Sequence, residues 1–251
     1  NRAKHLPETV ESILGQSFKD FEYIVVDDGS TDDSAAVLAH YGSRLNYLRH
    51  DNVGEAASTN RGWREAQGEY FAMVSSDDPM KPDWLENAVA FMDANPDVLV
   101  GYPDWEMIDM RSDVLQTIQV YEYSARRLYG WVHCLPGPGA LIRKSALNTG
   151  YQLRSPELHY VSDLESWFRL GLLGRFARIP KVLATWRLHP DSTSIADNSL
   201  QRSAETTSVV RAFFDRDDLP MEIRHLRRMA FSRAYYLAAV FVRDTHPVRA
   251  M

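Results

Sequence analysis

The sequence predicts an α/β fold, in which a sheet is covered by helices on both faces. Over the first two thirds of the 251 residues, short apolar segments alternate with segments of helical periodicity. The connections between these segments are short. Two of the apolar runs end in paired acids, Asp27-Asp28 and Asp77-Asp78. Because ligands bind beyond the carboxyl ends of strands in open α/β sheets, these acids predict a ligand site at that edge.

The N-terminal elements follow from apolar spacing and from capping residues. Residues 6–14 repeat apolar side chains at helical spacing, and Pro7 stands where a first helical turn tolerates proline. Residues 21–26 are apolar and β-rich, which is typical of a buried strand. Residues 30–41 begin with side chains that suit a helix N-terminus and end before Gly42, so they predict a helix.

The alternation continues through the next four elements. Residues 45–49 predict a strand, and residues 54–67 predict a helix that ends at Gly68. Residues 69–75 predict the third strand. The following helix begins at Pro82, because proline fits a first turn and apolar residues then recur three and four positions apart.

The second half of the chain is predicted in less detail. Residues 98–120 predict strands and loops, and a Gly-Pro-Gly turn precedes an expected strand at 140–142. Residues 163–173 predict a helix that a glycine ends, and residues 182–189 predict one more strand. From about residue 199 the pattern is helical throughout, in two segments separated by an aspartate- and proline-containing stretch.

The composition excludes several classes of protein. Hydrophobic residues make up 45% and charged residues 25%, which is typical of a globular domain. The formal net charge of −6 argues against a broad nucleic-acid-binding surface, so no nucleic-acid partner is expected. No apolar run reaches the roughly 18 residues of a membrane span. The single cysteine, Cys134, excludes an internal disulfide framework and a cysteine-based zinc site.

The paired acids are the first candidates for chemistry. Adjacent carboxylates repel each other unless a cation or a sugar hydroxyl lies between them. Mg²⁺ and Mn²⁺ prefer oxygen ligands and commonly bridge a carboxylate to a diphosphate. Asp27-Asp28 and Asp77-Asp78 therefore predict a metal-diphosphate site at one edge of the sheet. From the residues alone, the alternative that these acids structure loops and cap helices stays open.

Several motifs follow one another in an order and spacing that match a known family. They are Asn1-Arg2, Gln16-Ser17-Phe18, FEYIVVDDGSTD at residues 21–32, Asn52-Val53-Gly54, Asn60-Arg61-Gly62, Ala66-Gln67-Gly68-Glu69-Tyr70, Ser75-Ser76-Asp77-Asp78, Ser162-Asp163-Leu164-Glu165-Ser166-Trp167 and Trp186-Arg187-Leu188-His189-Pro190. In these motifs the chain resembles the family 2 glycosyltransferases of the GT-A fold. Each motif is weak alone, whereas their common order is specific.

The resemblance implies a Rossmann-like, nucleotide-binding mixed sheet flanked by helices. It implies a GT-A catalytic domain over residues 1–195, and residues 196–251 are then an expected helical extension. The implied reaction moves a sugar from a nucleotide-diphosphate donor, expected to be a UDP-sugar, to an acceptor hydroxyl. The implied mechanism is a metal-assisted single displacement with inversion.

The resemblance also implies roles for single residues. Asp163 is the expected catalytic base, and Asp77 and His189 are the expected ligands of Mn²⁺ or Mg²⁺. The expected contacts to the nucleotide sugar are Asp27, Asp28, Asn52, Asn60, Ser76 and Asp78. Among them, Asp28 resembles the acid that hydrogen-bonds the base of a uridine nucleotide. A plain helix N-cap is the alternative for Asp163, although a catalytic acid at a helix start can serve both purposes.

The chain departs from the family pattern in two ways. Ser75 stands where an acid is usual, Ser162 where a glutamate is usual, and Thr59 where an arginine is common, which suggests an unusual donor pocket or weak metal dependence. Family members also begin with a hydrophobic strand that ends in an asparagine, at the position of Asn1. That strand would lie between the first and third predicted strands, and without it their backbone groups would lack partners. We therefore expect the natural polypeptide to extend upstream.

The partners are less determined than the donor. Glycans, lipid-linked molecules and proteins all stay open as acceptors. For the C-terminal helices, three roles stay open: packing within the chain, joining two subunits of a homo-oligomer, and peripheral contact with a membrane. The expected location is the cytoplasm, at the inner face of the membrane in the third case. Two other functions are open, a nucleotidyltransferase and a catalytically inactive, GT-A-like module that binds carbohydrate or nucleotide.

Overall fold

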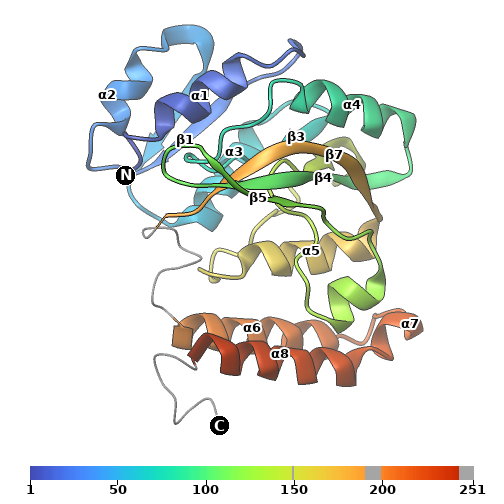
Figure 1. Cartoon of the computed structure of the whole chain (residues 1–251). Helices are drawn as coiled ribbons and strands as arrows, with labels where there is room; N and C mark the ends of the chain where they lie inside the picture. Colours follow the sequence, from blue (N-terminus) through green and yellow to red (C-terminus); the bar gives the residue numbers. More distant parts are fainter. Residues whose placement is uncertain (149, 190–198, 243–251) are drawn as a thin grey trace. The chain divides into compact units, whose positions relative to one another are not determined.

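The computed structural model describes residues 1–148, 150–189 and 199–242 (Figure 1). The chain packs into two compact units. Among the described residues, unit 1 falls within Asn1–Glu122, Pro136–Leu153 and Gly174–His189, and unit 2 within Tyr123–Leu135, Arg154–Leu173 and residues 199–242. The predicted domain boundary between residues 195 and 196 lies outside the described residues, so it stays a prediction.

Unit 1 contains the alternating helices and strands. They are α1 (Leu6–Leu14), β1 (Ile24–Asp28), α2 (Ser34–Ala39), β2 (Asn46–His50), α3 (Glu55–Glu65), β3 (Tyr70–Ala72), α4 (Trp84–Ala94), β4 (Val98–Ile108), β5 (Val114–Ile118), β6 (Leu141–Arg143) and β7 (Arg175–Arg187). Short 3₁₀ turns follow α2 and β6. The predicted order of elements is confirmed.

Among the described residues, the strands form a two-stranded and a five-stranded sheet. Strands β1 and β2 run parallel, with Ile24 opposite Asn46 and Asp28 opposite His50. The larger sheet has the order β3-β6-β4-β5, and its neighbouring strands are antiparallel. Strand β7 pairs with β4 in parallel. The predicted mixed sheet is therefore confirmed.

Strands β1 and β3 belong to different sheets in the described chain. These are the strands between which the family pattern places a further strand. The expectation that the natural polypeptide extends upstream of Asn1 stays a prediction.

The core of unit 1 is built around β4. This strand is buried from Val98 to Asp104 because strand β7 pairs with it in the sheet and helix α4 packs against it. Met92 of α4 packs on Gly101, where a Cβ would lie 2.8 Å from the Met92 sulfur. Met92 and Leu183 are completely buried, and burial of a side chain of this size stabilises the fold by about 1.5–3 kcal/mol. The packing fixes β7, whose C-terminal end leads to His189.

Unit 2 is helical. Its elements are a short π-helix (Arg126–Gly130), α5 (Ser162–Leu173), α6 (Ser199–Phe214), α7 (Met221–Arg224) and α8 (Arg227–Val242). The predicted break in the C-terminal helical segment is confirmed, because α6 ends before the Asp- and Pro-containing stretch and α7 begins after it. No helix among the described residues is both long and apolar enough to cross a membrane.

Aromatic and small side chains form the core of unit 2. The rings of Tyr129, Phe168 and Phe213 lie 4.8–5.3 Å apart between centroids. Such aromatic pairs contribute about 0.5–1.5 kcal/mol beyond their burial. On α8, buried alanines recur every four residues (Ala230, Ala234 and Ala238), and this narrow stripe lets α8 lie close beside α6 (Figure 1).

Some element boundaries differ from the predicted ones. Helix α2 begins at Ser34 instead of residue 30, because the carboxylate of Asp32 accepts the Ser34 backbone N–H at 3.0 Å and holds a loop there. Strand β7 begins at Arg175 instead of residue 182, because it pairs with β4 from Val98 onward. Long-range pairing of this kind leaves no local signal in the sequence.

Candidate functional site

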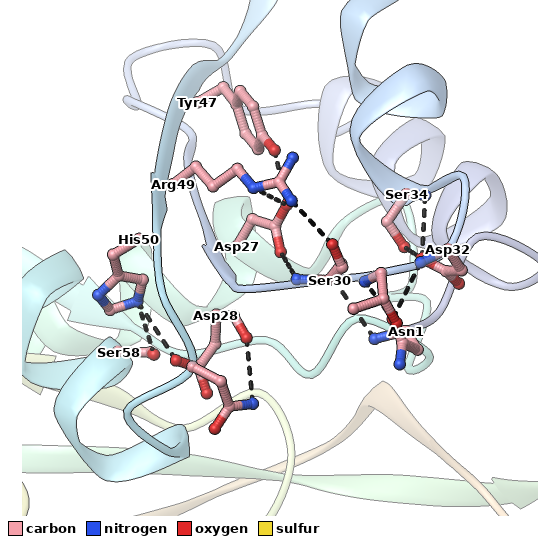
Figure 2. Close-up of polar contacts among 12 residues, drawn as sticks. Asn1, Asp27, Asp28, Ser30, Asp32, Ser34, Tyr47, Arg49, His50 and Ser58 are labelled. Atoms are coloured by element: carbon pink, nitrogen blue, oxygen red, sulfur yellow. Dashed lines mark hydrogen bonds and ion pairs between the residues drawn. The ribbon is translucent and has the colours of Figure 1, made fainter.

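Asp27, near the end of β1, holds the loop that follows it (Figure 2). Its carboxylate accepts the Ser30 backbone N–H at 2.8 Å and the Tyr47 hydroxyl at 2.6 Å, and Arg49 Nε lies 3.7 Å away. Burial raises the pKa of Asp27, but the hydrogen bonds from Tyr47 and Ser30 and the Arg49 charge outweigh it, so the pKa lies below its ordinary value. Asp27 is therefore an anion that structures the loop, and its expected contact to the nucleotide sugar stays a prediction.

Asp28 ends β1 and contacts the loop before α3. Its carboxylate oxygens accept the backbone N–H groups of Val53 at 2.7 Å and Gly54 at 3.0 Å. The Asn52 amide donates to the Asp28 carbonyl at 3.2 Å. His50 Nε2 lies 3.5 Å from the Asp28 carboxylate (Figure 2). Because α3 begins at Glu55, the Asp28 charge lies near the positive end of that helix.

Gly29 is required by the turn between these acids and Ser30. Its φ is +70°, a left-handed conformation that glycine adopts without strain. A Cβ at this position would lie 2.6 Å from the backbone nitrogen of Asn52. The loops after β1 and β2 therefore approach each other at a point where only a hydrogen atom fits.

The other expected donor contacts lie on separate elements of unit 1. Asn52 follows β2 and is bonded to Asp28, as described above. Asn60 is buried on α3. Ser76 is half-buried in the loop that leads from β3 to α4.

Asp77 and His189 come together in unit 1. His189 Nε2 lies 2.7 Å from Asp77 Oδ2, and the imidazole is almost completely buried. Arg2 Nε lies 3.2 Å from the same carboxylate oxygen. The ring of His5 stacks on His189 with 6.0 Å between centroids. Burial, and next the Arg187 charge, lower the pKa of His5.

Asp78 turns its carboxylate to the backbone of β7. It accepts the Arg187 backbone N–H at 2.7 Å and is buried. Burial raises the pKa of Asp78 to about 7, with a smaller contribution from the neighbouring Asp77 charge. The two carboxylates of the pair therefore occupy different environments: Asp77 contacts Arg2 and His189, whereas Asp78 is buried and accepts a backbone N–H of β7.

The side chains of Asp77 and His189 fit part of a cation site. A carboxylate oxygen and an imidazole nitrogen are both ligands that Mn²⁺ accepts. Among the described residues, no group of three or more His, Cys, Asp or Glu side chains is arranged to hold a metal ion. Two protein ligands fit a cation that shares its remaining positions with phosphate oxygens and water, as is usual for Mg²⁺ at nucleotide sites.

Arg187 is a site residue to which sequence reasoning gave no role. Its guanidinium is completely buried and donates to the Asp77 carbonyl at 2.9 Å, the Asp109 carbonyl at 2.7 Å and the Glu8 carboxylate at 2.7 Å. It therefore ties the Asp77 loop to β7 and to α1. In the sequence, the feature that could have indicated a role for Arg187 is its position in the motif from Trp186 to Pro190.

Residues 1 and 2 connect the two acidic groups of unit 1. The Asn1 side-chain oxygen accepts the Thr31 backbone N–H at 2.7 Å, in the loop that Asp27 structures. The next residue, Arg2, contacts Asp77. The loop after β1 and the loop after β3 are thus linked through two consecutive residues.

Asp163, the expected base, lies in unit 2 on the first turn of α5. The helix begins at Ser162, so Asp163 lies inside the turn and is not the N-cap. One carboxylate oxygen accepts the Leu164 backbone N–H at 2.7 Å, and the other lies 3.5 Å from the Cys134 sulfur. Burial, and next the Asp163 charge, raise the pKa of the Cys134 thiol, so the thiol is a neutral donor to this carboxylate.

Comparisons with known proteins show the family to which the chain is related. The model of "Glycosyl transferase family 2" matches residues 1–150. An uncharacterized glycosyltransferase of Rickettsia prowazekii is 30% identical over 209 residues, which are 80% of this chain. The matched part is 65% of that protein, so this chain spans somewhat less than two thirds of its relative's length.

Two solved structures share the fold. S. aureus TarS, in complex with UDP-GlcNAc, is 21% identical with a TM-score of 0.70, over 96% of this chain and 71% of that chain. The mannosyltransferase PcManGT from Pyrobaculum calidifontis, in complex with GDP-Man and Mn²⁺, is 17% identical with a TM-score of 0.64, over 100% of this chain and 74% of that chain. The predicted GT-A fold is confirmed. Because the family model also covers more than half of the residues, the chain belongs to glycosyltransferase family 2.

Proposed function

We propose that the chain catalyses transfer of a sugar from a nucleotide-diphosphate donor, a UDP-sugar, to an acceptor hydroxyl with inversion. The observation that carries this proposal is the meeting of Asp77 with the buried His189 at 2.7 Å. A carboxylate after one strand and an imidazole after another form the protein half of a cation-diphosphate site. The nucleotide-sugar complexes of TarS and PcManGT support the donor class.

In this proposal the loops after β1 and β2 bind the nucleoside. Asp28 already accepts two backbone N–H groups, from Val53 and Gly54. A carboxylate has about four acceptor positions, so Asp28 retains capacity for a hydrogen bond from the uracil ring. The backbone clamp then orients the carboxylate before the nucleotide arrives, which lowers the entropy lost on binding.

The diphosphate is assigned to Asp77 and His189. These two side chains would hold Mn²⁺ or Mg²⁺, which when bound stabilises the charge that develops on the leaving diphosphate. Arg2, 3.2 Å from Asp77, adds a guanidinium that suits phosphate oxygens. Arg187 donates to the Asp77 carbonyl and keeps the loop in one conformation.

Asp163 is assigned the proton transfer. As the acceptor oxygen bonds to the anomeric carbon, the carboxylate takes the hydroxyl proton. The bond from that carbon to the diphosphate oxygen breaks, and the nucleoside diphosphate leaves with the electron pair. Attack opposite the leaving group inverts the anomeric centre. The base has to lie about 2.6–3.2 Å from the acceptor oxygen.

A thermal-shift screen of nucleotide sugars, with Mn²⁺ or with a chelator, tests the donor and cation parts of the proposal. A ligand at 100 times its Kd stabilises the folded protein by about 2.7 kcal/mol, which raises Tm by several degrees. We expect a UDP-sugar to raise Tm with Mn²⁺ and less with the chelator. Asp77→Asn should lose the Mn²⁺-dependent part, whereas Asp20→Asn, at an exposed acid, should keep it.

The screen also contains the results that would contradict the proposal. An equal shift with the chelator present would overturn the cation assignment. If no nucleotide sugar shifts Tm, the donor assignment is wrong. Product masses separate sugar transfer from nucleotidyl transfer, because sugar transfer releases the nucleoside diphosphate and nucleotidyl transfer releases pyrophosphate.

A further inference from the structure

A side chain from α6 holds the loop that leads into the helix of Asp163. Glu205 is buried, and its carboxylate accepts the backbone N–H groups of Tyr160 at 2.8 Å and His159 at 3.1 Å. Gln201, one turn earlier on α6, donates to the same carboxylate at 2.9 Å. Hydrogen bonds to an ionised acceptor are among the strong ones in proteins, and two from successive residues fix a segment's orientation.

We call the Glu205 carboxylate and the two backbone N–H groups bonded to it the clamp. The clamp lies close to the proposed base along the chain. Tyr160 precedes Asp163 by three positions, and α5 begins between them, at Ser162. On the other side of Asp163, Glu165 accepts the Ser155 hydroxyl at 2.9 Å, which closes the loop onto the helix. The first turn of α5 is therefore held through the loop before it.

Helix α6 also packs directly on α5. The Phe213 ring lies 4.8 Å from the Phe168 ring and stacks on Tyr129 at 5.0 Å. The Tyr129 hydroxyl donates to the Phe168 carbonyl at 3.3 Å. One helix of the predicted extension thus contacts both the body of α5 and the loop that leads into it.

We infer that Glu205 is a positioning residue for the base Asp163, and that the C-terminal helices serve catalysis through it. The inference rests on the proposed role of Asp163. Without the clamp, the first turn of α5 is free to shift. A misplacement of about 1 Å in a catalytic group can lower turnover about a hundredfold. The side chains assigned to the donor lie in unit 1, so the donor KM is the readout that should stay unchanged.

Three variants of the full chain separate positioning from stability. Glu205→Ala removes the acceptor of the clamp. Glu205→Gln keeps one side-chain oxygen as an acceptor for the same N–H groups. Arg227→Ala is the matched control, because Arg227 ties α8 to Asp215, just after α6, by an ion pair at 2.7 Å and makes no contact with the clamp. Tm is measured for each, so that activities are compared at known stability.

Amide hydrogen exchange is the first readout. In Glu205→Ala we expect the amides of His159 and Tyr160 to exchange at least about tenfold faster, because their acceptor is gone. Arg227→Ala should leave these two amides unchanged. If Glu205→Ala leaves their exchange unchanged, the clamp does not order the loop and the inference is overturned.

Turnover is the second readout, measured as UDP release from the nucleotide sugar that the screen selects, with water as the hydroxyl that receives the sugar. We expect Glu205→Ala to lower kcat about tenfold to a hundredfold with the donor KM within about twofold, and Glu205→Gln to recover most of it. An unchanged kcat in Glu205→Ala, or an equal fall in Arg227→Ala, would overturn the inference.

Asp163→Asn distinguishes failure of this inference from failure of the proposed function. If Asp163→Asn is inactive while Glu205→Ala is fully active, the positioning role alone is wrong. If Asp163→Asn keeps its turnover, or the wild-type chain releases no nucleoside diphosphate from any donor, the proposed function fails and the positioning role fails with it.

Discussion

Replacing Gly29 by alanine tests whether the contact between the loops after β1 and β2 organises the nucleoside end of the site. The left-handed backbone alone costs alanine about 1–2 kcal/mol. The new Cβ would also lie 2.6 Å from the Asn52 nitrogen, where ordinary contacts begin at 3.4 Å, so one loop has to move by about 0.8 Å. Strain of this kind costs about 1–3 kcal/mol more. We therefore expect Gly29→Ala to lose about 2–5 kcal/mol of unfolding free energy.

Gly42→Ala is the matched control for this prediction. Gly42 also has a positive φ, +54°, but no described atom lies within 4 Å of an added Cβ. It should lose only the backbone contribution, about 1–2 kcal/mol. Urea denaturation followed by tryptophan fluorescence measures both losses, and calorimetry measures UDP affinity.

The binding measurement separates the two glycine positions further. We expect Gly29→Ala to bind UDP at least about tenfold more weakly, because a displaced Asn52 loop no longer orients Asp28. Gly42→Ala should bind UDP like the wild type. Equal stability losses in the two variants, or normal UDP affinity in Gly29→Ala, would refute the reasoning.

Two further predictions concern stability. Arg187→Met leaves the part-buried carbonyls of Asp77 and Asp109 without their donor, and we expect a loss of about 3–5 kcal/mol by urea denaturation. Lys181→Met, at an exposed ion pair with Asp83, should lose no more than about 1 kcal/mol, and similar losses in the two would contradict the assigned role of Arg187. Hydrogen bonds from Ser34 and Ala3 lower the pKa of Asp32 from 3.8 to about 2. Because the folded-state pKa is depressed, this contribution is complete above about pH 4 and is lost as the pH falls to about 2. Asp32→Asn should flatten the dependence of unfolding free energy on pH in that range, and an unchanged slope would count against it.

The order of elements could be predicted from the sequence because each helix and strand carries its own local signal. Pro7 lies in the first turn of α1, and the apolar runs at residues 21–26 and 69–75 contain strands β1 and β3. The helix expected to begin at Pro82 begins instead at Trp84, with Asp83 as its N-cap. The meeting of Asp77 and His189 could be expected only from the family resemblance, because 112 positions separate them. No periodicity reports a contact over that distance.

The roles of Arg187 and Glu205 could not be predicted, because they too depend on contacts between residues far apart in the sequence. Arg187 ends a strand, and Glu205 lies on a helix with other polar residues, so both resemble solvent-exposed charges in the sequence. Their burial depends on which backbone groups the fold brings to them. Asp27 and Asp28 both accept backbone N–H groups, so each holds a loop, and their expected contacts to the nucleotide sugar stay predictions.

The central claim is that the chain transfers the sugar of a nucleotide sugar to an acceptor hydroxyl, with Asp163 as the base that takes the hydroxyl proton. Release of UDP from the selected donor, compared between the wild type and Asp163→Asn in the presence of Mn²⁺, tests it. A general base contributes about a hundredfold to ten-thousandfold in rate, so we predict a fall of at least about a hundredfold with unchanged donor affinity. Near-normal UDP release by Asp163→Asn would contradict the claim.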